Sequence, residues 1–443
     1  MTRDLGLTPI ARWLDDRLGL GGWARRALNK AFPDHWSFLL GEIAMYCFAV
    51  LVATGLFLTL FFRPSAAVVV YDGSYEPLRG VEVSQAYASV LDVTFDVRAG
   101  LLVRQVHHWT ALVFVAAIVL HLMRVFFTGA FRRPREVNWL VGVTMLLLAL
   151  FTGYTGYSLP GDLLSGAALR IGTGVLQSIP VVGTWLLFLL LGGEFPSPQL
   201  IPRLFAFHVL LLPVGIATLL GIHMAILWHQ KHTQFPGEKR TDKNVVGPPL
   251  WPAYMARTTG LLCAVVAVLV ALGALFQINP VWLYGPFNPS TTTAPAQPDW
   301  YWGWMDGALR TFPNWEFRGL GRMIANPFFP GVLLPALTFL GLYAWPFLEA
   351  RFTGDRGEHQ LLDRPRDHPL RTGIGAGVVS FYALLTLAGM NDTISRLLDQ
   401  PIFRVTGALR IAILVVPVIV GVVTWRALVA VGRASPSTEQ VGA

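Results

Sequence analysis

Four histidines lie in pairs along two long apolar stretches of the sequence. His107 and His121 are 14 residues apart in the first stretch, and His208 and His223 are 15 apart in the second. Because an α-helix turns by about 100° per residue, a spacing of 14 brings the first pair to within about 40° of one face, about 21 Å apart along the axis. A spacing of 15 overshoots four turns by about 60°. Pro213 lies between the second pair, where a local bulge or kink can restore the alignment.

Ionisable groups inside a hydrocarbon layer are costly and usually mark functional sites. Matched imidazoles at two depths, facing each other from two helices, suit two six-coordinate haem irons in a helix bundle. Cys47 and Cys263 stand singly and form no Cys-x-x-Cys-His attachment motif, so the haems would be held without a covalent bond. A membrane histidine can instead bond to a neighbouring helix, and we interpret His108, which is out of phase with His121, in this way.

Haem also requires close approach of the helix backbone and cations for its propionates. Arg104 and Arg124 each lie three residues from a histidine of the first pair, about one helical turn away, which suits a propionate partner. Glycine lets a backbone contact a flat ring, and two further apolar stretches each carry glycines 14 residues apart, at Gly41, Gly55, Gly142 and Gly156. The alternatives are ordinary helix packing for the glycines and snorkelling to the lipid surface for the arginines.

These residues belong to a chain with the composition of a bilayer protein. Of its 443 residues 54% are hydrophobic and 14% are charged, and the mean hydropathy is +0.53. We therefore expect an all-α membrane protein whose first four spans form a dihaem four-helix bundle. Since about 20 apolar residues cross a membrane as a helix, we expect eight spans, at Phe38–Phe62, Leu101–Phe127, Trp139–Tyr157, Leu204–Trp228, Gly260–Ile278, Phe328–Phe347, Ile374–Met390 and Leu409–Leu428.

The connections between the spans predict the topology. Val175–Gly193 is apolar too, but Pro180 and Gly183 interrupt it, so we expect short surface helices in the loop before the fourth span. Lys and Arg favour the N-terminal segment and the connections after the second, fourth and sixth spans, which predicts cytoplasmic termini. The first 36 residues lack a signal-peptide pattern, so the first span should direct insertion. The net charge of +8 then reflects topology and anionic lipid, not nucleic-acid binding.

The predicted organisation has five parts. They are an amphipathic cytoplasmic segment (1–36), the dihaem bundle (37–232), a cytoplasmic linker (233–259), a second four-helix membrane domain (260–430) and a short cytoplasmic tail (431–443). Within the second membrane domain, residues 280–327 form a loop at the outer face.

Together the paired histidines, the arginines and the glycines resemble the cytochrome b subunit of the cytochrome bc complexes, the quinol–cytochrome c reductases, over all eight spans. Two motifs strengthen the resemblance: Gly156-Tyr157-Ser158-Leu159-Pro160 ends the third span, and Pro298-Asp299-Trp300-Tyr301 is similar to the family's Pro-Glu-Trp-Tyr signature, with Asp in place of Glu. The runs Trp228–Gly237 and Ser178–Trp185 resemble the actinobacterial menaquinol branch, whose cytoplasmic extension after the last span is usually longer than the tail seen here.

The resemblance implies a translocase subunit in a bacterial plasma membrane. A quinol, menaquinol in this branch, is oxidised at the outer face and gives one electron to a Rieske iron–sulfur protein. The other electron passes through an outer haem on His107 and His208 and an inner haem on His121 and His223 to a quinone near the cytoplasm. Because quinol oxidation releases protons, Asp299 is the predicted acceptor, and the outer quinol site is completed by Pro298, Trp300, Tyr301, Asp306 and Tyr157.

The inner quinone site is less distinct in the sequence. The resemblance places His229 and Arg257 there, and Trp36, Ser37 and Glu42 near the first span are further candidates. The alternative for Glu42 is an ion pair with a basic residue. Thr258 stands where the family has Asp, so proton uptake would use another group. The implied partners are the Rieske subunit, a c-type cytochrome subunit, a second copy in a homodimer, membrane lipid and a terminal oxidase in a supercomplex.

Two other classes of membrane protein share part of this pattern. A dihaem anchor of a dehydrogenase or hydrogenase carries paired histidines, but it lacks the loop with Pro298-Asp299-Trp300-Tyr301 and usually has fewer spans. A transporter places ionisable residues near the midplane of broken helices and shows internal repeats, which the sequence does not. Trp302 and Trp304 in the outer loop we interpret as an aromatic belt at the membrane interface.

Overall fold

The structure is a computed structural model that describes residues 9–290, 297–319 and 322–434. Its described residues include eight helices that are long and apolar enough to cross a membrane, which confirms the predicted number. The spans are Trp36–Thr59 (η1, Trp36–Phe38, and α3, Leu39–Thr59), Gly100–Phe127 (α5), Glu136–Tyr157 (α6), Leu200–Gln230 (α9, Leu200–Ala206; η3, Phe207–Leu211; α10, Leu212–Gln230), Leu250–Leu275 (η4, Leu250–Tyr254; α11, Met255–Leu275), Phe329–Thr353 (η5, Phe329–Leu333; α14, Leu334–Thr353), Pro369–Ala388 (α15) and Ile402–Arg433 (within α17, Ile402–Ala434).

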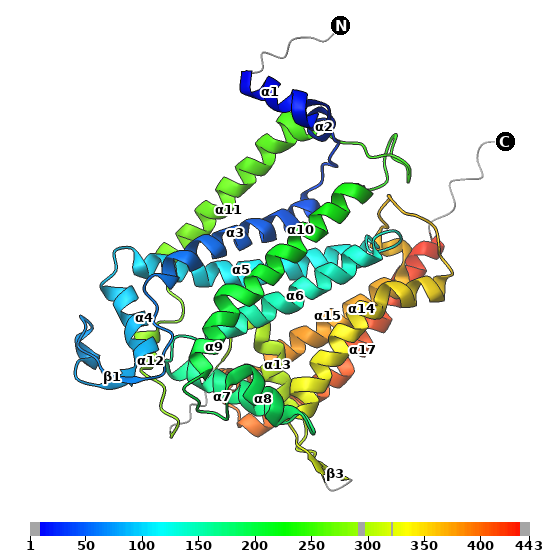
Figure 1. Cartoon of the computed structure of the whole chain (residues 1–443). Helices are drawn as coiled ribbons and strands as arrows, with labels where there is room; N and C mark the ends of the chain where they lie inside the picture. The colour runs from blue at the N-terminus through cyan, green and yellow to red at the C-terminus, as the bar shows by residue number, and fades with distance from the viewer. Residues whose placement is uncertain (1–8, 291–296, 320–321, 435–443) are drawn as a thin grey trace, which may run out of the picture.

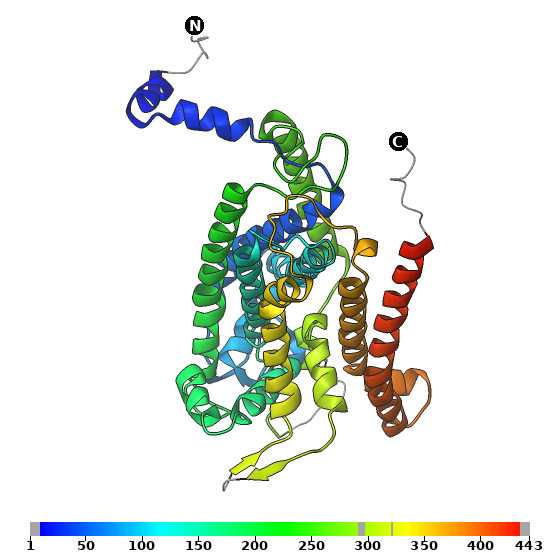
Figure 2. The same ribbon diagram turned by 90° about the vertical axis from the view of Figure 1, so that its right-hand side faces the viewer.

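The first four spans form the predicted bundle. Helix α3 packs along α5, α6 packs along α10, and α5 also contacts α6 (Figures 1 and 2). Of the later spans, α11 lies against α3 and α5, α14 against α6, and α15 pairs with α17. The largest buried cluster joins α3, α5, α6 and α11 to helix α13 (Trp300–Thr311) through residues such as Cys47, Val115 and Tyr301. The first three spans, the fifth span and the loop helix α13 therefore share one core.

We call the end of the bundle that carries α13 the outer end, following the topology predicted from the sequence. The surface helices expected before the fourth span are present there as α7 (Leu163–Gln177) and α8 (Gly183–Leu191), which confirms that prediction. The same end holds β1 (Val68–Val70) paired antiparallel with β2 (Glu82–Ser84), η2 (Glu76–Leu78), α4 (Gln85–Phe95), α12 (Val281–Tyr284), the pair β3 (Phe317–Gly319) and β4 (Arg322–Ile324), and α16 (Asn391–Leu397).

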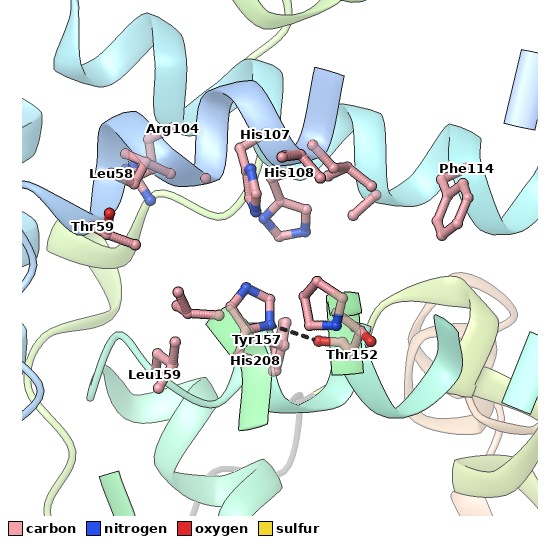
Figure 3. Close-up of a pocket in the computed structure, with 18 of the residues that line it drawn as sticks. Leu58, Thr59, Arg104, His107, His108, Phe114, Thr152, Tyr157, Leu159 and His208 are labelled. Atoms are coloured by element: carbon pink, nitrogen blue, oxygen red, sulfur yellow. Dashed lines mark hydrogen bonds between the residues drawn. The ribbon is translucent and has the colours of Figure 1, made fainter. Parts of the chain in front are cut away.

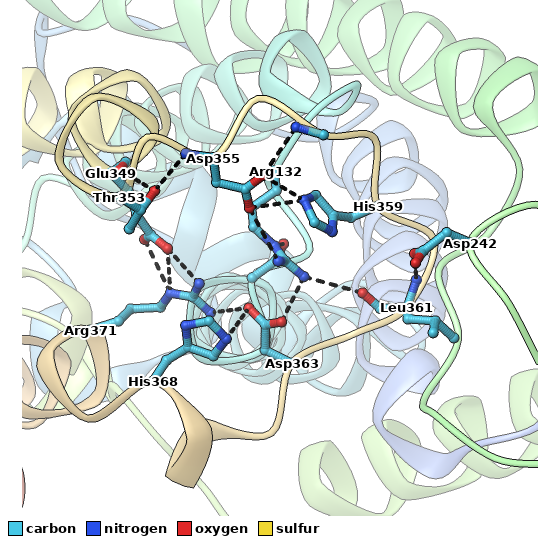
Figure 4. A network of polar contacts seen from close by, with 12 residues as sticks. Arg132, Asp242, Glu349, Thr353, Asp355, His359, Leu361, Asp363, His368 and Arg371 are labelled. Carbon is cyan, nitrogen blue, oxygen red and sulfur yellow. Dashed lines mark hydrogen bonds and ion pairs between the residues drawn. The ribbon is translucent and has the colours of Figure 1, made fainter. Parts of the chain in front are cut away.

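The opposite, inner end carries α1 (Pro9–Leu18), α2 (Leu20–Leu28) and η6 (Pro365–Asp367). A polar network ties its loops to the spans (Figure 4). Arg371 at the start of α15 is only 4% exposed and binds both Glu349 of α14 and Asp363 of the loop between them. Arg132, in the loop after α5, binds the same Asp363 (2.7 Å). A buried cation is stable only when paired, so this network fixes the loop against the bundle.

Candidate functional site

The outer half of the bundle encloses a cavity of about 270 Å³ between α3, α5, α6 and the fourth span (Figure 3). His107 and His208 face each other across it, with ring centroids 6.2 Å apart. A bond between a metal ion and an imidazole nitrogen is about 2 Å long, so this gap has room for one iron atom bound by both rings. We call this space the outer cavity.

Both outer histidines are oriented through their Nδ1 atoms. The His208 ring donates from Nδ1 to the backbone carbonyl of Thr152 (3.0 Å). The hydroxyl of Thr54 donates to the carbonyl of Val50 (2.7 Å) and lies 2.8 Å from Nδ1 of His107, so it accepts the Nδ1 proton of that ring. With Nδ1 protonated in both rings, each Nε2 keeps a lone pair for a metal.

A second, larger cavity of about 440 Å³ lies in the inner half of the bundle and contains the other pair, His121 and His223. Both rings line this inner cavity. Unlike the outer pair, neither ring has a hydrogen-bond partner at its buried Nδ1 within the part of the chain that the structure describes. The four predicted ligands therefore form two pairs at two depths, as expected from their spacing.

The 15-residue spacing of His208 and His223 is accommodated by a π-helical turn. Residues Phe207–Leu211 form this turn, η3, between the α-helical segments α9 and α10. A π-turn takes up one extra residue without breaking the helix, so both histidines face the bundle interior. This is the local bulge that the sequence predicted near Pro213.

One glycine stands beside each of the four histidines. A Cβ added at any of these positions would meet the Cε1 atom of the neighbouring ring, so the glycines let the α3 and α6 backbones approach the rings. The pairs are Gly41 with His121 (3.2 Å), Gly55 with His107 (3.3 Å), Gly142 with His223 (3.8 Å) and Gly156 with His208, where the added atom would overlap the ring.

The two arginines predicted for the propionates are buried at the cavities, Arg104 in the outer one and Arg124 in the inner one. The Nε and Nη2 atoms of Arg104 in the outer cavity, and the Nε atom of Arg124 in the inner one, are buried without a hydrogen-bond partner among the described residues. The Arg124 guanidinium lies 5.1 Å from the ring centre of Phe38. A buried guanidinium with free donors fits an anionic group of a ligand, such as a propionate. The histidines, glycines and arginines thus fit a haem in each cavity.

Asp299 forms part of the outer cavity wall and is held by two side chains. His108 donates from Nε2 to Oδ1 of Asp299 (2.9 Å), and the Tyr301 hydroxyl donates to Oδ2 (2.9 Å). The interpretation of His108 as a histidine that bonds a neighbouring helix is thus correct, but its partner is the predicted proton acceptor, which the sequence did not reveal. His108 lines the outer cavity beside His107, and a second polar residue of α5 next to a ligand was the available signal in the sequence.

A smaller cavity of about 60 Å³ lies on the other side of Asp299. Asp299 and Tyr301 line both this cavity and the outer cavity, and so does Tyr157, whose hydroxyl donates to the carbonyl of Gln297 (3.3 Å). Pro298 and Asp306 line the small cavity as well, so five of the six predicted outer-site residues come together. The sixth, Trp300, is 43% exposed and lines neither.

Asp306, on the same wall, forms an ion pair with an arginine. Its carboxylate accepts from Nε of Arg310 (2.8 Å), which also lies 3.6 Å from Asp392. Burial raises the pKa of Asp306 to about 6, although the charge of Arg310 acts in the opposite direction. The assignment of Trp302 and Trp304 to an interface belt needs correction, because Trp302 lines the small cavity and donates to the carbonyl of Leu150 (3.2 Å), while Trp304 donates to the carbonyl of Tyr301 inside the fold.

The inner cavity wall differs from the one that the sequence predicted. Of the five residues expected there, Glu42 lines the cavity and the other four do not. His229 is exposed, Trp36 is 71% exposed, Ser37 is buried against Nδ1 of His35, and Arg257 forms an exposed ion pair with Asp34.

Beside Glu42, the polar side chains that line the inner cavity include Lys30, His232, Tyr254 and Thr258. Burial, with the nearby charges of Lys30 and two arginines, lowers the pKa of His232 to about 4, so this imidazole is neutral near pH 7. The Lys30 amino group donates to the carbonyl of Trp228.

The sequence is similar to that of a known protein family. Residues 112–286 match the family model described as cytochrome b(N-terminal)/b6/petB. The chain is 51% identical over 430 residues to the "Cytochrome bc1 complex cytochrome b subunit" of Mycobacterium tuberculosis strain H37Rv, covering 97% of this chain and 78% of that one. It is 50% identical to the subunit of the same name in Mycobacterium leprae (99% and 80% covered) and 47% identical to that in Streptomyces coelicolor (94% and 76% covered).

The fold is also similar to a solved structure. A chain of the structure titled "Hyperthermophilic respiratory Complex III" superimposes with a TM-score of 0.67 at 22% identity, covering 94% of this chain and 99% of that one. At this identity the likeness speaks for the shared fold.

Proposed function

The chain belongs to the cytochrome b subunits of the cytochrome bc1 complexes, the quinol–cytochrome c reductases, and on this premise we propose that it couples quinol oxidation at its outer end to quinone reduction at its inner end through two b-type haems. The observation that carries the proposal is the repetition of one ligand scheme at two depths. In both cavities an imidazole from α5 faces one from the fourth span, with a glycine beside each ring.

The residues of this chain have distinct roles at the outer end. Quinol enters the small cavity, and Asp299 in its wall accepts one of the protons released on oxidation. Tyr301 and His108 hold the two carboxylate oxygens and fix the carboxylate between the two cavities. A b-type haem, when bound, supplies a one-electron carrier. One electron of the quinol therefore goes to a Rieske iron–sulfur partner and the other toward the site of His107 and His208.

The second electron crosses the bundle to the inner pair, His121 and His223. A quinone in the inner cavity accepts it, and a second turnover of the outer site completes the reduction. The histidine pairs span about 21 Å along α5, as judged from the helical rise between its two ligands. The separation gives the reaction a direction across the membrane and so contributes to a proton gradient.

The assembly proposed around this chain follows the family. We expect a Rieske subunit, a c-type cytochrome subunit, a second copy in a homodimer and a terminal oxidase in a supercomplex, with menaquinol as the substrate. The chain would lie in the bacterial plasma membrane with both termini on the cytoplasmic side. The exposure of large apolar side chains on α17, such as Ile411 and Leu414, fits contact with lipid.

The experiment that tests the proposal counts haems in the purified complex. We expect a reduced haemochrome assay to give two b-type haems per chain in the wild type, and a count of one or none would overturn the proposal. His208→Ala should lose the outer haem alone, and His223→Ala the inner haem alone, because each cavity has its own ligand pair. Redox titration distinguishes the two haems, and a variant that retains both would contradict the ligand assignment.

A further inference from the structure

The inner cavity contains a carboxylate that the sequence named for the inner quinone site without a chemical role. Glu42, in the first turn of α3, is the one acidic residue among the residues that line this cavity in the described part of the chain. It lies next to Gly41, which contacts the ring of the inner ligand His121. Glu42 therefore stands in the space where a quinone must bind to receive electrons at the inner end.

The carboxylate is held by hydroxyl groups from the facing helix. Tyr254 donates to Oε1 of Glu42, and Thr258 donates to Oε2 (2.5 Å). Thr258 in turn accepts a hydrogen bond from Tyr46, since its own proton goes to Glu42. No Lys or Arg side chain forms an ion pair with Glu42 within the residues described. Arg257, which directly precedes Thr258 in the sequence, pairs with Asp34 at the surface instead.

A carboxylate inside a membrane helix without a cation is expensive to maintain. Hydrogen bonds from hydroxyl groups compensate part of that cost. They can stabilise both the ionised and the protonated carboxyl, because a hydroxyl can rotate to donate a hydrogen bond to the first or accept one from the second. Such a site suits a carboxyl group that gains and loses a proton during catalytic turnover. A purely structural carboxylate would gain more from a cation than from hydroxyls.

The other polar groups of the cavity are poorer acids for this purpose. His232 is neutral near pH 7, because burial lowers its pKa to about 4, and so it holds no proton that an imidazolium could give. The Lys30 amino group is engaged with the carbonyl of Trp228. Arg124 faces the haem space and does not release a proton in proteins.

We propose that Glu42 is the proton donor of the inner quinone site, positioned by Thr258 and Tyr254. This inference rests on the proposed function, which supplies the two electrons through the inner haem. Quinone takes up two electrons, one at a time, and two protons to become quinol. The Glu42 carboxyl transfers one proton to a quinone oxygen and regains a proton from the aqueous phase at the inner end. The second proton reaches the other oxygen from the same phase.

The arrangement also explains Thr258. The resemblance to cytochrome b places an Asp at that position, and here the hydroxyl of Thr258 binds a carboxylate that comes from α3. The acid at this place in the cavity thus stands on α3, and α11 contributes the hydroxyl that holds it.

The test uses the whole purified complex with a short-chain menaquinol analogue. Stopped-flow spectra follow the reduction of the inner haem through the outer site and then its reoxidation by quinone. We expect Glu42→Gln to leave the first reduction unchanged and to slow reoxidation by at least about tenfold. Glu42→Asp, which keeps the carboxyl, should recover part of the rate. A redox-induced infrared difference spectrum should lose the carbonyl band of a protonated carboxyl in Glu42→Gln and show it shifted in Glu42→Asp.

The matched control is Glu136→Gln. Glu136 also stands in the first turn of a span at the inner end, on α6, and lines neither cavity. It should change neither the rate nor the infrared band. Reoxidation at the wild-type rate in Glu42→Gln, or an equal slowing in Glu136→Gln, would overturn the inference. If the Glu42→Gln complex does not assemble, Tyr254→Phe provides the test. This change removes one hydrogen bond to the Glu42 carboxyl and should shift its infrared carbonyl band. A wild-type complex whose inner haem is never reduced would instead refute the proposed function.

Discussion

The outer and inner cavities use the same four-residue scheme but differ in how firmly it is held. In the outer cavity both imidazoles are fixed through Nδ1, by the Thr54 hydroxyl and the Thr152 carbonyl. In the inner cavity the Nδ1 atoms of His121 and His223 have no partner among the described residues. Ligand orientation and basicity depend on that second nitrogen, so the outer site is the more constrained of the two.

The cavities also differ in where the acid stands. At the outer end Asp299 comes from a loop helix and separates the outer cavity from a small neighbouring one. At the inner end Glu42 lies within the same cavity as the ligands. A divided outer site keeps a substrate apart from the electron carrier, which suits a reaction that must send two electrons along different routes. An undivided inner site suits a substrate that collects both electrons from one carrier.

The largest effect should come from removing the dividing carboxylate. Asp299→Asn keeps the size of the side chain but cannot accept a proton, so quinol oxidation should slow roughly a hundredfold. Haem content should stay intact, because Asp299 contacts neither member of a ligand pair through a hydrogen bond. Steady-state cytochrome c reduction and a haemochrome spectrum measure the two quantities. Turnover at the wild-type rate would show that Asp299 is not the proton acceptor. It would also contradict the proposed contrast between a divided outer site and an undivided inner site.

A smaller effect should appear in the pH profile through Asp306. Its carboxyl has a pKa raised by burial to about 6, so it is protonated below that pH and charged above it. If the charged form takes protons onward from the small cavity, quinol oxidation in the wild type should fall about tenfold between pH 7 and pH 5. Asp306→Asn should be slower at pH 7 and nearly flat over this range. If the pH profile of quinol oxidation in Asp306→Asn still shows an inflection near pH 6, that inflection belongs to another group.

The smallest effect should follow from loosening the outer ligand. Thr54→Val removes the hydroxyl that accepts from Nδ1 of His107 while keeping the shape of the side chain. A less basic imidazole stabilises the oxidised iron less, so the potential of the outer haem should rise by about 30 to 60 mV, the equivalent of roughly one hydrogen bond. Redox titration measures both haems at once. The inner haem, whose ligands lack hydrogen-bond partners at Nδ1 within the described part of the chain, should keep its reduction potential. An equal shift in the potentials of both haems would contradict the proposed difference between the two sites.

Much of the fold was predictable because it depends on composition and on regular spacing. The eight spans, the surface helices α7 and α8 and the pairing of the histidines follow from apolar length and from a rotation of about 100° per residue. Even the need for a bulge near His208 followed from arithmetic, and η3 supplies it.

The walls of the cavities were harder to predict, because they join segments that are distant in sequence. His108 and Asp299 are 191 residues apart, and Glu42 and Thr258 are 216 apart. Neighbouring residues on a helix point about 100° apart, which is why Thr258 faces the cavity while Arg257 faces the surface. An apolar helix gives no sequence signal of which of two adjacent polar residues turns inward. The inner-site prediction therefore named Arg257 and not Thr258, although it included Glu42.

The π-helical turn at Phe207–Leu211 bears on how this helix can change over evolutionary time. One residue inserted into or deleted from an ordinary α-helix rotates everything beyond it, and a ligand beyond that point would face lipid. Here the added residue is absorbed within a single turn beside His208, and His223 keeps its direction. Helix α5, which is uninterrupted from Gly100 to Phe127, sets the spacing of the two sites. The fourth span can therefore tolerate a change of one residue in length. The distance between the two haem sites is set by α5, and the π-helical turn lets the ligands of the fourth span stay level with those of α5.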